Sequence, residues 1–466
     1  MVKSLIGFIK SGFKEINPWT NIQLLHTNVR GDILAGIIVA IIALPLALAF
    51  GEVSQLGAKA GLWSAVVGGL IGGLFGGCLV GVSGPTMPMA SQIAAFGVVI
   101  GSGSPDLTSA FSIIFLSGLI LTFFSILKIS RFIYFVPYSA IAGFMCGIAA
   151  IVILGQINPF IGIQDVDANR PIWVIKNFFQ SMQNININVL YVSLPSLILL
   201  LIWPLISKKN KFINKIPSPL PALIMGSFIA YFIDLRSINP DYFIASINSA
   251  SLKIYQPDLS RITEYIGPAF VLASLAVIDS LLSCRVADTM TGTRHSSDRE
   301  TFGQGMANMA SGFVGGISTA TATTQTVGNV TFGAKTPFAT MIKGFVMLLV
   351  IVFLGKLVSY IPIACLAAIL FKLGIDILDY RVLPVLKRLP LTDLFIFCIV
   401  FFTTIFANLI TAVGIGVLFA ILRYFKEVMY TFKSSFKHKI ISFSDSDLMI
   451  LNKKKNRPFF YKSFKA

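Results

Sequence analysis

The sequence predicts an all-α polytopic membrane protein, and three observations carry this prediction. Hydrophobic residues make up 55% of the 466 residues and charged residues only 12%, whereas a soluble domain carries about 25% charged residues. Apolar runs long enough to cross a hydrocarbon core of about 30 Å recur along the chain. The net charge of +17 is carried mainly by loops and tails, which favours membrane topology and contact with anionic lipid over a nucleic-acid partner.

Complete transmembrane spans are expected wherever an apolar run is uninterrupted. These runs cover residues 32–51, 60–77, 107–127, 135–155, 188–206, 218–234, 264–284, 302–318, 336–356, 358–374, 390–408 and 410–428. Two further segments, 83–100 and 321–334, contain too much Pro, Gly, Ser and Thr for ordinary lipid-facing spans, so we expect interrupted helices there. The expected total is fourteen transmembrane segments.

The two interrupted segments occupy the third and tenth positions in this order. Each is therefore the third span of a seven-span half, and an odd number of spans turns the second half over relative to the first. This is the inverted-repeat plan, in which paired interrupted segments meet near the middle of the bilayer. We expect repeat one at about 31–235 and repeat two at about 263–430, which together form one transport domain over 31–430.

Basic residues mark one side of this layout. They are Lys128, Arg131, Lys208, Lys209, Lys211, Lys215, Arg285, Arg294, Arg299, Lys335, Arg381, Lys387 and Arg388. The opposite loops, 101–106 and 157–171, carry Asp165 and Asp167 against a single Arg170. The positive-inside rule then places both termini in the cytoplasm of a plasma (inner) membrane protein.

The two ends of the chain are expected to stay outside the bilayer. Residues 1–30 have the character of a basic, amphipathic segment that lies on the cytoplasmic membrane surface. Residues 431–466 are expected to form a short basic cytoplasmic tail.

A small anion is the ligand that the two interrupted segments favour. Two prolines and a glycine in Ser83-Gly84-Pro85-Thr86-Met87-Pro88 cannot lie inside a continuous helix, and Pro88 suits the first turn of a helix that begins there. Ser318-Thr319-Ala320-Thr321-Ala322-Thr323-Thr324 suits an extended lead-in to a second half-helix, which its hydroxyl groups can cap. Two helix N-termini aimed at one point attract an anion without an arginine. The alternative is a pair of kinked, tightly packed spans.

Asp279 is the candidate cation ligand, because an ionisable residue inside an apolar span suggests function. Ser283 lies four residues on, so both side chains share one helix face. Together with carbonyl groups of Thr321, Ala322 and Thr323, they offer the hard oxygen ligands that suit Na⁺. The alternatives are proton coupling through Asp279, or a buried aspartate without a transport role.

Other chemistry finds little support in the sequence. The cysteines Cys78, Cys146, Cys284, Cys365 and Cys398 lie in or at the ends of apolar runs, without metal-ligand spacing. The isolated histidines at 26, 295 and 438 are assigned no metal, and the glycine-dense stretch 61–77 suits close helix packing. No nucleotide-binding or hydrolase motif stands in a suitable context, so we expect neither an enzyme nor an organic cofactor.

Several stretches resemble the SulP anion-transporter family. They are GDILAGIIVAIIALPLALAFG (31–51), SGPTMPMA (83–90), VPYSAIAGFMCGIA (136–149), VIDSLLSCRVADTMTGTRHSSDRETFGQGMAN (277–308), SGFVGGISTATATT (311–324) and YIPIACLAAILFKLGIDILD (360–379). The resemblance covers roughly residues 30 to 430 and is greatest to the BicA-type, sodium-dependent bicarbonate transporters of that family.

The resemblance implies a seven-plus-seven inverted-repeat fold with core and gate domains, and it implies which residues bind. The implied sodium ligands are Asp279, Ser283, Thr321, Ala322 and Thr323. The implied anion site lies around Thr86 and comprises Ser83, Gly84, Pro85, Thr86, Met87, Ala322, Thr323 and Thr324. The chain departs from the pattern in three ways. Ser283 replaces a threonine, ISTATAT replaces a glycine-rich lead-in, and the usual cytoplasmic STAS domain has no counterpart, which removes that basis for expecting a homodimer.

The resulting prediction is a secondary transporter that moves bicarbonate inward with Na⁺ by an elevator-like movement. A sulfate or other oxyanion permease, which could be coupled to protons, is the first alternative. An anion channel is the second alternative, although a buried aspartate near the pathway favours a coupled carrier.

Overall fold

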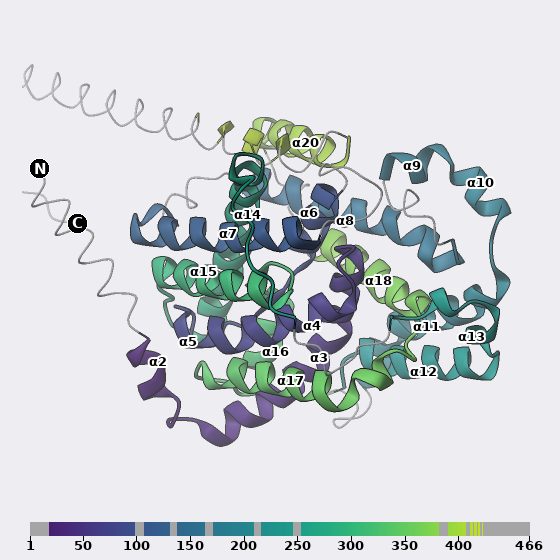
Figure 1. The fold of residues 1–466 in the computed structure, drawn as a ribbon, viewed down its shortest axis with the longest axis horizontal. Helices are drawn as coiled ribbons and strands as arrows, with labels where there is room; N and C mark the ends of the chain where they lie inside the picture. The colour runs from purple at the N-terminus through teal and green to yellow at the C-terminus, as the bar shows by residue number, and fades with distance from the viewer. Residues whose placement is uncertain are drawn as a thin grey trace, which may run out of the picture.

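The structure is a computed structural model, and it describes residues 18–97, 107–130, 138–163, 171–208, 216–245, 253–381 and 390–406, with a few residues between 411 and 422. The chain is a packed assembly of helices with one pair of very short strands (Figure 1). The strands are β1 (Ser83–Pro85) and β2 (Thr319–Thr321), so the all-α prediction is correct except at this junction.

The first half of the chain contains eleven of the helical elements described here. They are α2 (Trp19–Leu24), α3 (Val29–Val53), α4 (Ala58–Val67), the π-helical turn η1 (Gly68–Gly72), α5 (Gly73–Phe75), α6 (Met87–Gly97), α7 (Leu107–Ile126), α8 (Tyr138–Ile161), α9 (Pro171–Lys176), α10 (Phe178–Gln183) and α11 (Ile187–Ser207).

The remaining elements follow a polar connection and include the longest helix described. They are α12 (Pro219–Phe232), α13 (Leu235–Ile238), the 3₁₀ turn η5 (Pro240–Tyr242), α14 (Ile262–Thr291), α15 (Ser297–Val314), α16 (Thr323–Thr331), α17 (Phe338–Val358), α18 (Ile363–Arg381) and α20 (Leu391–Phe406).

Seven of the described helices are long and apolar enough to cross a membrane. They are Val29–Val53, Ala58–Phe75, Leu107–Ile126, Ser139–Ile161, Ile187–Ser207, Ile262–Thr291 and Phe338–Val358. Two shorter apolar helices, α12 and α20, coincide with further expected spans. The full count of fourteen stays a prediction. The described residues leave out most of the expected last span, residues 1–17 of the N-terminal segment and the 431–466 tail.

Both interrupted segments divide into an extended piece and a half-helix. Residues 83–85 form β1, and α6 begins at Met87 with Pro88 in its first turn, as the prolines predict. Residues 319–321 form β2, and α16 follows at Thr323. Neither segment is therefore a continuous membrane-spanning helix.

The helices fall into two groups by their packing. In the first group, α3, α4 and η1 pack against α17, while α7 packs against α14 and α15. Figure 1 shows α7, α15, α4 and α17 stacked beside one another. In the second group, α8 packs against α18 and α20, and α11 packs against α12 and α18.

Glycines allow the close approach within the first group. A Cβ added at Gly69 would lie 2.6 Å from the Cα of Gly344, and one added at Gly68 would lie 2.9 Å from the Cα of Gly84. Backbones this close leave no room for a side chain. The glycine-dense stretch is thus the packing face that the sequence predicts.

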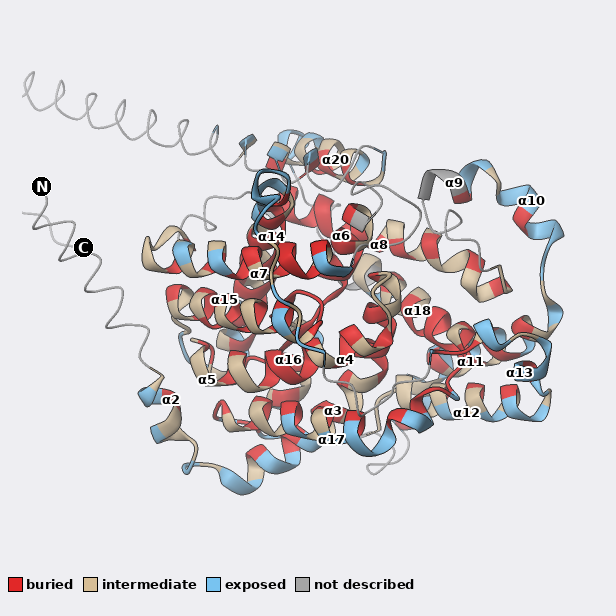
Figure 2. Cartoon of the chain, in the orientation of Figure 1, coloured by how far each residue is buried: buried red, intermediate tan, exposed pale blue. Residues whose placement is uncertain are grey.

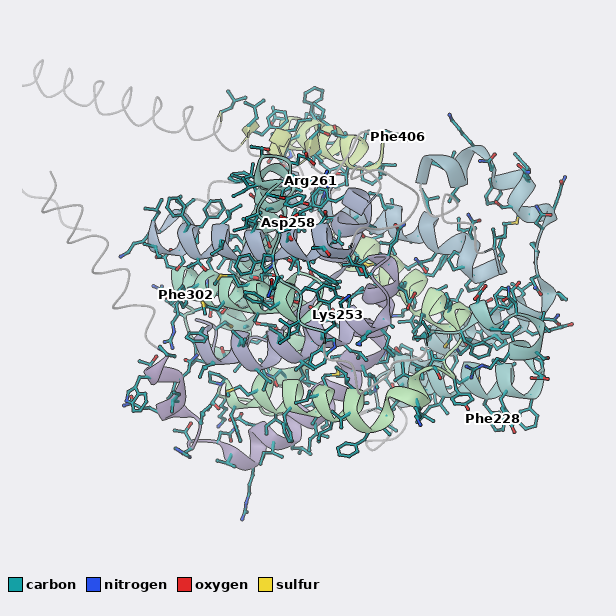
Figure 3. The ribbon with its side chains drawn as sticks, in the orientation of Figure 1. Phe228, Lys253, Asp258, Arg261, Phe302 and Phe406 are labelled. Carbon is teal, nitrogen blue, oxygen red and sulfur yellow. The ribbon has the colours of Figure 1, made fainter. Side chains whose placement is uncertain are left out.

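The outer surface is rich in large apolar side chains, whereas small and polar residues concentrate inside. Phe228 on α12 and Phe406 on α20 are 61% and 55% exposed and project outward (Figure 3). The buried positions shown in Figure 2 concentrate in α4, α6, α14 and α16 and in the facing sides of their neighbours. This distribution suits a protein whose exterior meets lipid.

Candidate functional site

The two interrupted segments meet as an antiparallel strand pair in the protein interior. Ser83 pairs with Thr321, Gly84 with Ala320 and Pro85 with Thr319. All residues of β1 and β2 are buried. Segments more than 230 positions apart in the chain are thereby joined at one junction.

Further hydrogen bonds lock the junction. The N–H of Ala322 donates to the carbonyl of Val82 at 2.9 Å, and the N–H of Val82 donates to Thr326 Oγ1 at 3.1 Å. Asn329 Nδ2 donates to the carbonyl of Val80 at 2.9 Å. The half-helix α16 is therefore fixed to the chain that leads into β1.

Each strand leads directly into a helix N-terminus. The carbonyl of Thr86 accepts a bond from the N–H of Ala90, and the carbonyl of Ala322 accepts one from the N–H of Thr326. The first N–H groups of a helix have no partner within the helix, and they carry partial positive charge. The junction therefore joins the segments that lead into two positive helix ends.

The cap of α16 differs from the sequence expectation. Ala322 occupies the N-cap position, and no side chain caps the helix there. The threonine hydroxyls of β2 point elsewhere, because Thr319 Oγ1 donates to Gln304 Oε1 at 3.2 Å and Thr321 Oγ1 donates to Glu300 Oε1. The helix end is thus left open for a ligand.

The proposed anion-facing residues differ in accessibility. Thr324 is exposed, Ala322 and Thr323 are half-buried, and Thr86 and Met87 are buried. Thr86 Oγ1 has no hydrogen-bond partner among the described residues. Ser83, by contrast, already accepts a hydrogen bond at its Oγ from Gln304 Nε2 at 2.7 Å.

Helix α14 brings the proposed cation ligands to the same junction. Ser283 Oγ lies 2.6 Å from Thr323 Oγ1, and Ser280 Oγ accepts a hydrogen bond from the N–H of Thr321 at 3.0 Å. Asp279 is 8% exposed and precedes Ser280 directly. The chain therefore gathers a carboxylate, two hydroxyl groups and the β2–α16 backbone in one region, a set of hard oxygen donors that suits Na⁺.

A buried carboxylate, Glu300, supports the junction from α15. Its Oε2 accepts hydrogen bonds from the N–H groups of Gly77 and Cys78, each at 2.9 Å. Its Oε1 accepts hydrogen bonds from Thr321 Oγ1 and from Gln304 Nε2, the latter at 3.0 Å. Four donors on one buried carboxylate anchor β2 and the end of α5.

Two amides on α15 continue this support. Gln304 Nε2 also donates to Thr321 Oγ1 at 2.9 Å. Asn308 binds the backbone of Thr319 on both sides, since its Nδ2 donates to the carbonyl at 3.0 Å and its Oδ1 accepts from the N–H at 2.6 Å. Sequence reasoning missed Glu300, Gln304 and Asn308, although their spacing of four residues places all three on one helix face.

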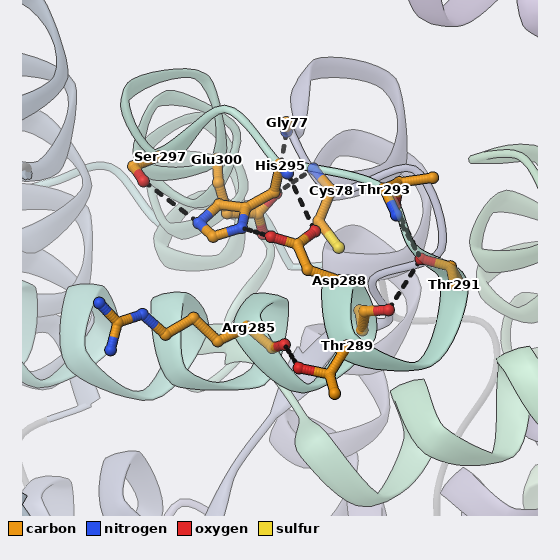
Figure 4. A network of polar contacts seen from close by, with 11 residues as sticks. Gly77, Cys78, Arg285, Asp288, Thr289, Thr291, Thr293, His295, Ser297 and Glu300 are labelled. Carbon is orange, nitrogen blue, oxygen red and sulfur yellow. Dashed lines mark hydrogen bonds and ion pairs between the residues drawn. The ribbon is translucent and has the colours of Figure 1, made fainter. Parts of the chain in front are cut away.

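The turn between α14 and α15 determines where α15 begins (Figure 4). Asp288 accepts hydrogen bonds from the N–H of His295 at 2.9 Å and lies 2.7 Å from its Nδ1. Ser297 Oγ lies 3.1 Å from His295 Nε2. Asp, His and Ser side chains meet here, but their contacts all lie within the turn that precedes Glu300. We therefore assign His295 a structural role.

A buried lysine is the second feature that sequence reasoning missed. Lys343 on α17 is 0% exposed, and its Nζ donates to the carbonyl of Ser83 at 2.9 Å and to the carbonyl of Ala65 at 3.1 Å. Neither interrupted segment contains Lys or Arg, yet a lysine from another helix reaches β1. The run 338–358 holds two lysines, and Lys343, which unlike Lys356 lies away from the end of the run, was the signal for it.

Comparison with known proteins finds similarity to membrane anion transporters. A model of the Sulfate permease family matches residues 29–400. The chain is 35% identical over 399 residues to the bicarbonate transporter BicA of Picosynechococcus sp., covering 84% of this chain and 69% of that protein. It is 31% identical over 392 residues to the putative sulfate transporter YvdB of Bacillus subtilis, covering 84% of this chain and 72% of that protein.

A solved structure shares the fold. The transmembrane domain of a cyanobacterial bicarbonate transporter BicA superposes with a TM-score of 0.72 and 32% sequence identity. The match covers 85% of this chain and 98% of that domain.

Proposed function

The chain belongs to the sulfate permease (SulP) family of membrane anion transporters, and we propose that it takes up bicarbonate together with Na⁺. The observation that carries the proposal is the junction itself, where two half-helix N-termini lie beside a helix that bears one buried aspartate. The similarity to bicarbonate transporters over 84% of the chain supports bicarbonate as the anion.

The anion is proposed to bind at the N-termini of α6 and α16. The unpartnered Thr86 hydroxyl and the open end of α16 at Ala322 support this position. Backbone N–H groups at the two helix ends would hold the oxygens of the anion. The remaining assigned positions lie in the same two turns, and they are Ser83, Gly84, Pro85, Met87, Thr323 and Thr324.

Na⁺ is proposed to bind between α14 and the start of α16. The 2.6 Å contact of Ser283 with Thr323 supports this site, because it brings the α14 face that carries Asp279 onto the β2–α16 corner. Oxygen atoms of Asp279, Ser283, Thr321, Ala322 and Thr323 would be the ligands. Na⁺ is a transported coupling ion in this proposal, so no resident cofactor is needed.

Transport is proposed to proceed by movement of one helix group against the other. A cavity of about 360 Å³ supports this proposal, because Glu52 and Val53 of α3 line one side of it and residues of α8, α11 and α18 line the other. The fourteen-segment inverted repeat, the cytoplasmic position of both termini and an inner-membrane location belong to the same proposal. A homodimer also stays a prediction.

The direct experiment is Asp279→Asn. The variant loses the carboxylate that would bind Na⁺, so Na⁺-stimulated bicarbonate uptake is expected to fall to background in cells or vesicles. Glu264→Gln on the same helix is the matched control, because Glu264 is exposed and far from the junction along α14, and it should transport normally. Wild-type uptake by a folded Asp279→Asn protein would refute the sodium site.

A sulfate or other oxyanion permease is the second candidate. The similarity to a putative sulfate transporter favours it, and helix-end N–H groups bind carbonate and sulfate alike. Excess sulfate that abolishes uptake of labelled bicarbonate, with uptake driven by a pH gradient alone, would favour a proton-coupled oxyanion carrier.

A further inference from the structure

Lys343 poses an electrostatic problem that the proposed function leaves unsolved. Its side chain belongs to the second turn of the apolar helix Phe338–Val358 and is completely buried. Moving an ammonium group from water into such surroundings is costly unless an opposite charge compensates it. Two carbonyl oxygens accept hydrogen bonds from it but do not neutralise its charge.

The described residues provide no counter-charge for this lysine. Lys343 takes part in none of the ion pairs found among them. Glu300, the buried carboxylate of the junction, is saturated by four donors from the turn after α5, from β2 and from α15. A buried ionisable residue without an acidic partner inside a membrane protein indicates that its partner is a ligand or that it has another functional role.

The geometry places Lys343 beside the proposed anion site. Its Nζ lies 2.9 Å from the point where a Cβ at Gly84 would stand, and Gln325 Oε1 lies 3.9 Å from the same point. An extended residue spans at most about 3.5 Å, so the Nζ lies no more than about 13 Å from the first N–H of α6.

Both half-helix segments carry buried polar atoms without partners. Gln325 Oε1, from α16, and Gln92 Oε1, from α6, have no hydrogen-bond partner among the described residues, and both residues are 1% exposed. The hydroxyl of Thr86 is also unpartnered. One of these acceptors, Gln325 Oε1, lies close to the lysine, and a purely structural tether would not require a buried acceptor there to stay unpaired.

We propose that Lys343 is the fixed positive charge of the anion site, an inference that rests on the proposed function. The lysine offsets the charge of the bound anion, while Asp279 offsets the charge of Na⁺. Each ligand then enters a site that already contains its counter-charge. Bicarbonate binding consequently does not depend on Na⁺ for charge compensation.

The expected size of the effect follows from Coulomb's law. At about 13 Å and an effective dielectric constant of about 20, one fixed positive charge strengthens the binding of a monovalent anion about tenfold. The same charge opposes Na⁺ binding nearby. Removing it should therefore weaken the anion and should not weaken the cation.

The first experiment compares Lys343→Met with Lys356→Met. Methionine keeps much of the length of the lysine stem without its charge, and Lys356 is an exposed lysine on the same helix. For Lys343→Met, the KM for bicarbonate should rise about tenfold at saturating Na⁺. The Na⁺ concentration for half-maximal uptake should stay the same or fall, and Lys356→Met should match the wild type.

A structural tether gives a different result. If Lys343 only holds β1 against α4, its loss disorders the junction, and both bicarbonate and Na⁺ should bind more weakly or kcat alone should fall. An unchanged KM for bicarbonate, or a parallel loss of Na⁺ affinity, would overturn the assignment.

A second experiment uses the wild-type protein and does not depend on the folding of a variant. Thermal stabilisation by bicarbonate is measured in detergent with Na⁺ and with N-methyl-D-glucamine in its place, at equal ionic strength. Stabilisation in the absence of Na⁺ supports the assignment, and stabilisation only in its presence overturns it. If neither bicarbonate nor sulfate stabilises the protein under either condition, the proposed function itself fails, which is a distinct outcome.

Discussion

Among single residues, Glu300 shows most clearly how the junction is held. One carboxylate connects the end of α5, strand β2 and helix α15, and all its hydrogen bonds are internal. Charge-assisted hydrogen bonds of this kind are stronger than neutral ones. The position of the two strands therefore depends on a residue that touches neither proposed ligand.

Glu300→Gln is expected to destabilise the protein. The amide replaces one acceptor oxygen with a donor, so either two backbone N–H groups or the Thr321 hydroxyl and Gln304 amide lose their acceptor. Unsatisfied buried donors cost about 1–3 kcal/mol. Thermal unfolding in detergent should show a lower midpoint for Glu300→Gln, with Glu264→Gln unchanged. Equal midpoints for both variants would contradict this role of Glu300.

The sequence allowed some site residues to be predicted and concealed others. Asp279 and Ser283 were predicted because a carboxylate in an apolar run suggests function at membrane depth, and the structure places Ser283 against Thr323. Lys343 was missed because the long stem of a lysine can carry its charge to the membrane surface. Only the fold shows that this lysine turns inward to the carbonyl of Ser83.

Glu300, Gln304 and Asn308 were missed for a different reason. A helix that begins with several polar residues resembles an exposed cytoplasmic end. Their four-residue spacing indicates a common face, but not that the face packs on two strands formed more than 200 residues apart. Long-range pairing of this kind has no local signal.

At the scale of elements, the helix breaks were predictable and the strand pairing was not. Prolines and glycines end helices by known steric rules, so the start of α6 at Met87 agrees with the sequence. The paired strands, with Gly84 opposite Ala320, are held instead by hydrogen bonds from distant helices, those of Asn308 on α15 and of Lys343 on α17. The N-terminus of α16 shows the same dependence. It has no side-chain cap at Ala322, because Thr319 and Thr321 of β2 bond to α15 instead.

Gly69→Ala tests the close contact between η1 and α17. The added methyl would lie 2.6 Å from the Cα of Gly344 and 2.8 Å from the carbonyl oxygen of Thr340, so the two elements must separate. Overpacking of this kind costs about 1–3 kcal/mol, and α17 also carries Lys343. We expect a lower unfolding midpoint and less uptake.

Gly267→Ala on α14 is the matched control for this variant. No atom lies within 4 Å of its added Cβ, and alanine favours helix over glycine by about 1 kcal/mol. This variant should be at least as stable as the wild type. If Gly69→Ala had the same unfolding midpoint and uptake as Gly267→Ala, close packing of η1 on α17 would contribute to neither stability nor transport.

At the scale of the whole molecule, the packing pattern supports the proposed inverted repeat. Helix α3, which would open repeat one, packs on α17, and helix α14, which would open repeat two, packs on α7. Since α7 and α17 each follow a half-helix, the two contacts are equivalent under exchange of the repeats. The antiparallel crossing of β1 and β2 at the centre has the same symmetry.

Membership of the SulP family and the helical membrane fold agree with the sequence prediction, whereas the fourteen segments and the inverted repeat stay predictions. The chemistry of the substrate is less accessible to prediction, because two helix ends and a lysine recognise charge more than shape. Coupling to Na⁺ is therefore the central claim of this account. It depends on the carboxylate of Asp279 and the oxygen donors that surround it.

Uptake of labelled bicarbonate by purified protein in sealed vesicles tests this claim most directly. Na⁺ and pH gradients are imposed separately, and the membrane potential is held at zero. We expect an inward Na⁺ gradient alone to drive transient accumulation of bicarbonate above its external concentration, and a pH gradient without Na⁺ to drive none. Equilibration without accumulation, or accumulation driven by the pH gradient alone, would contradict sodium-coupled transport.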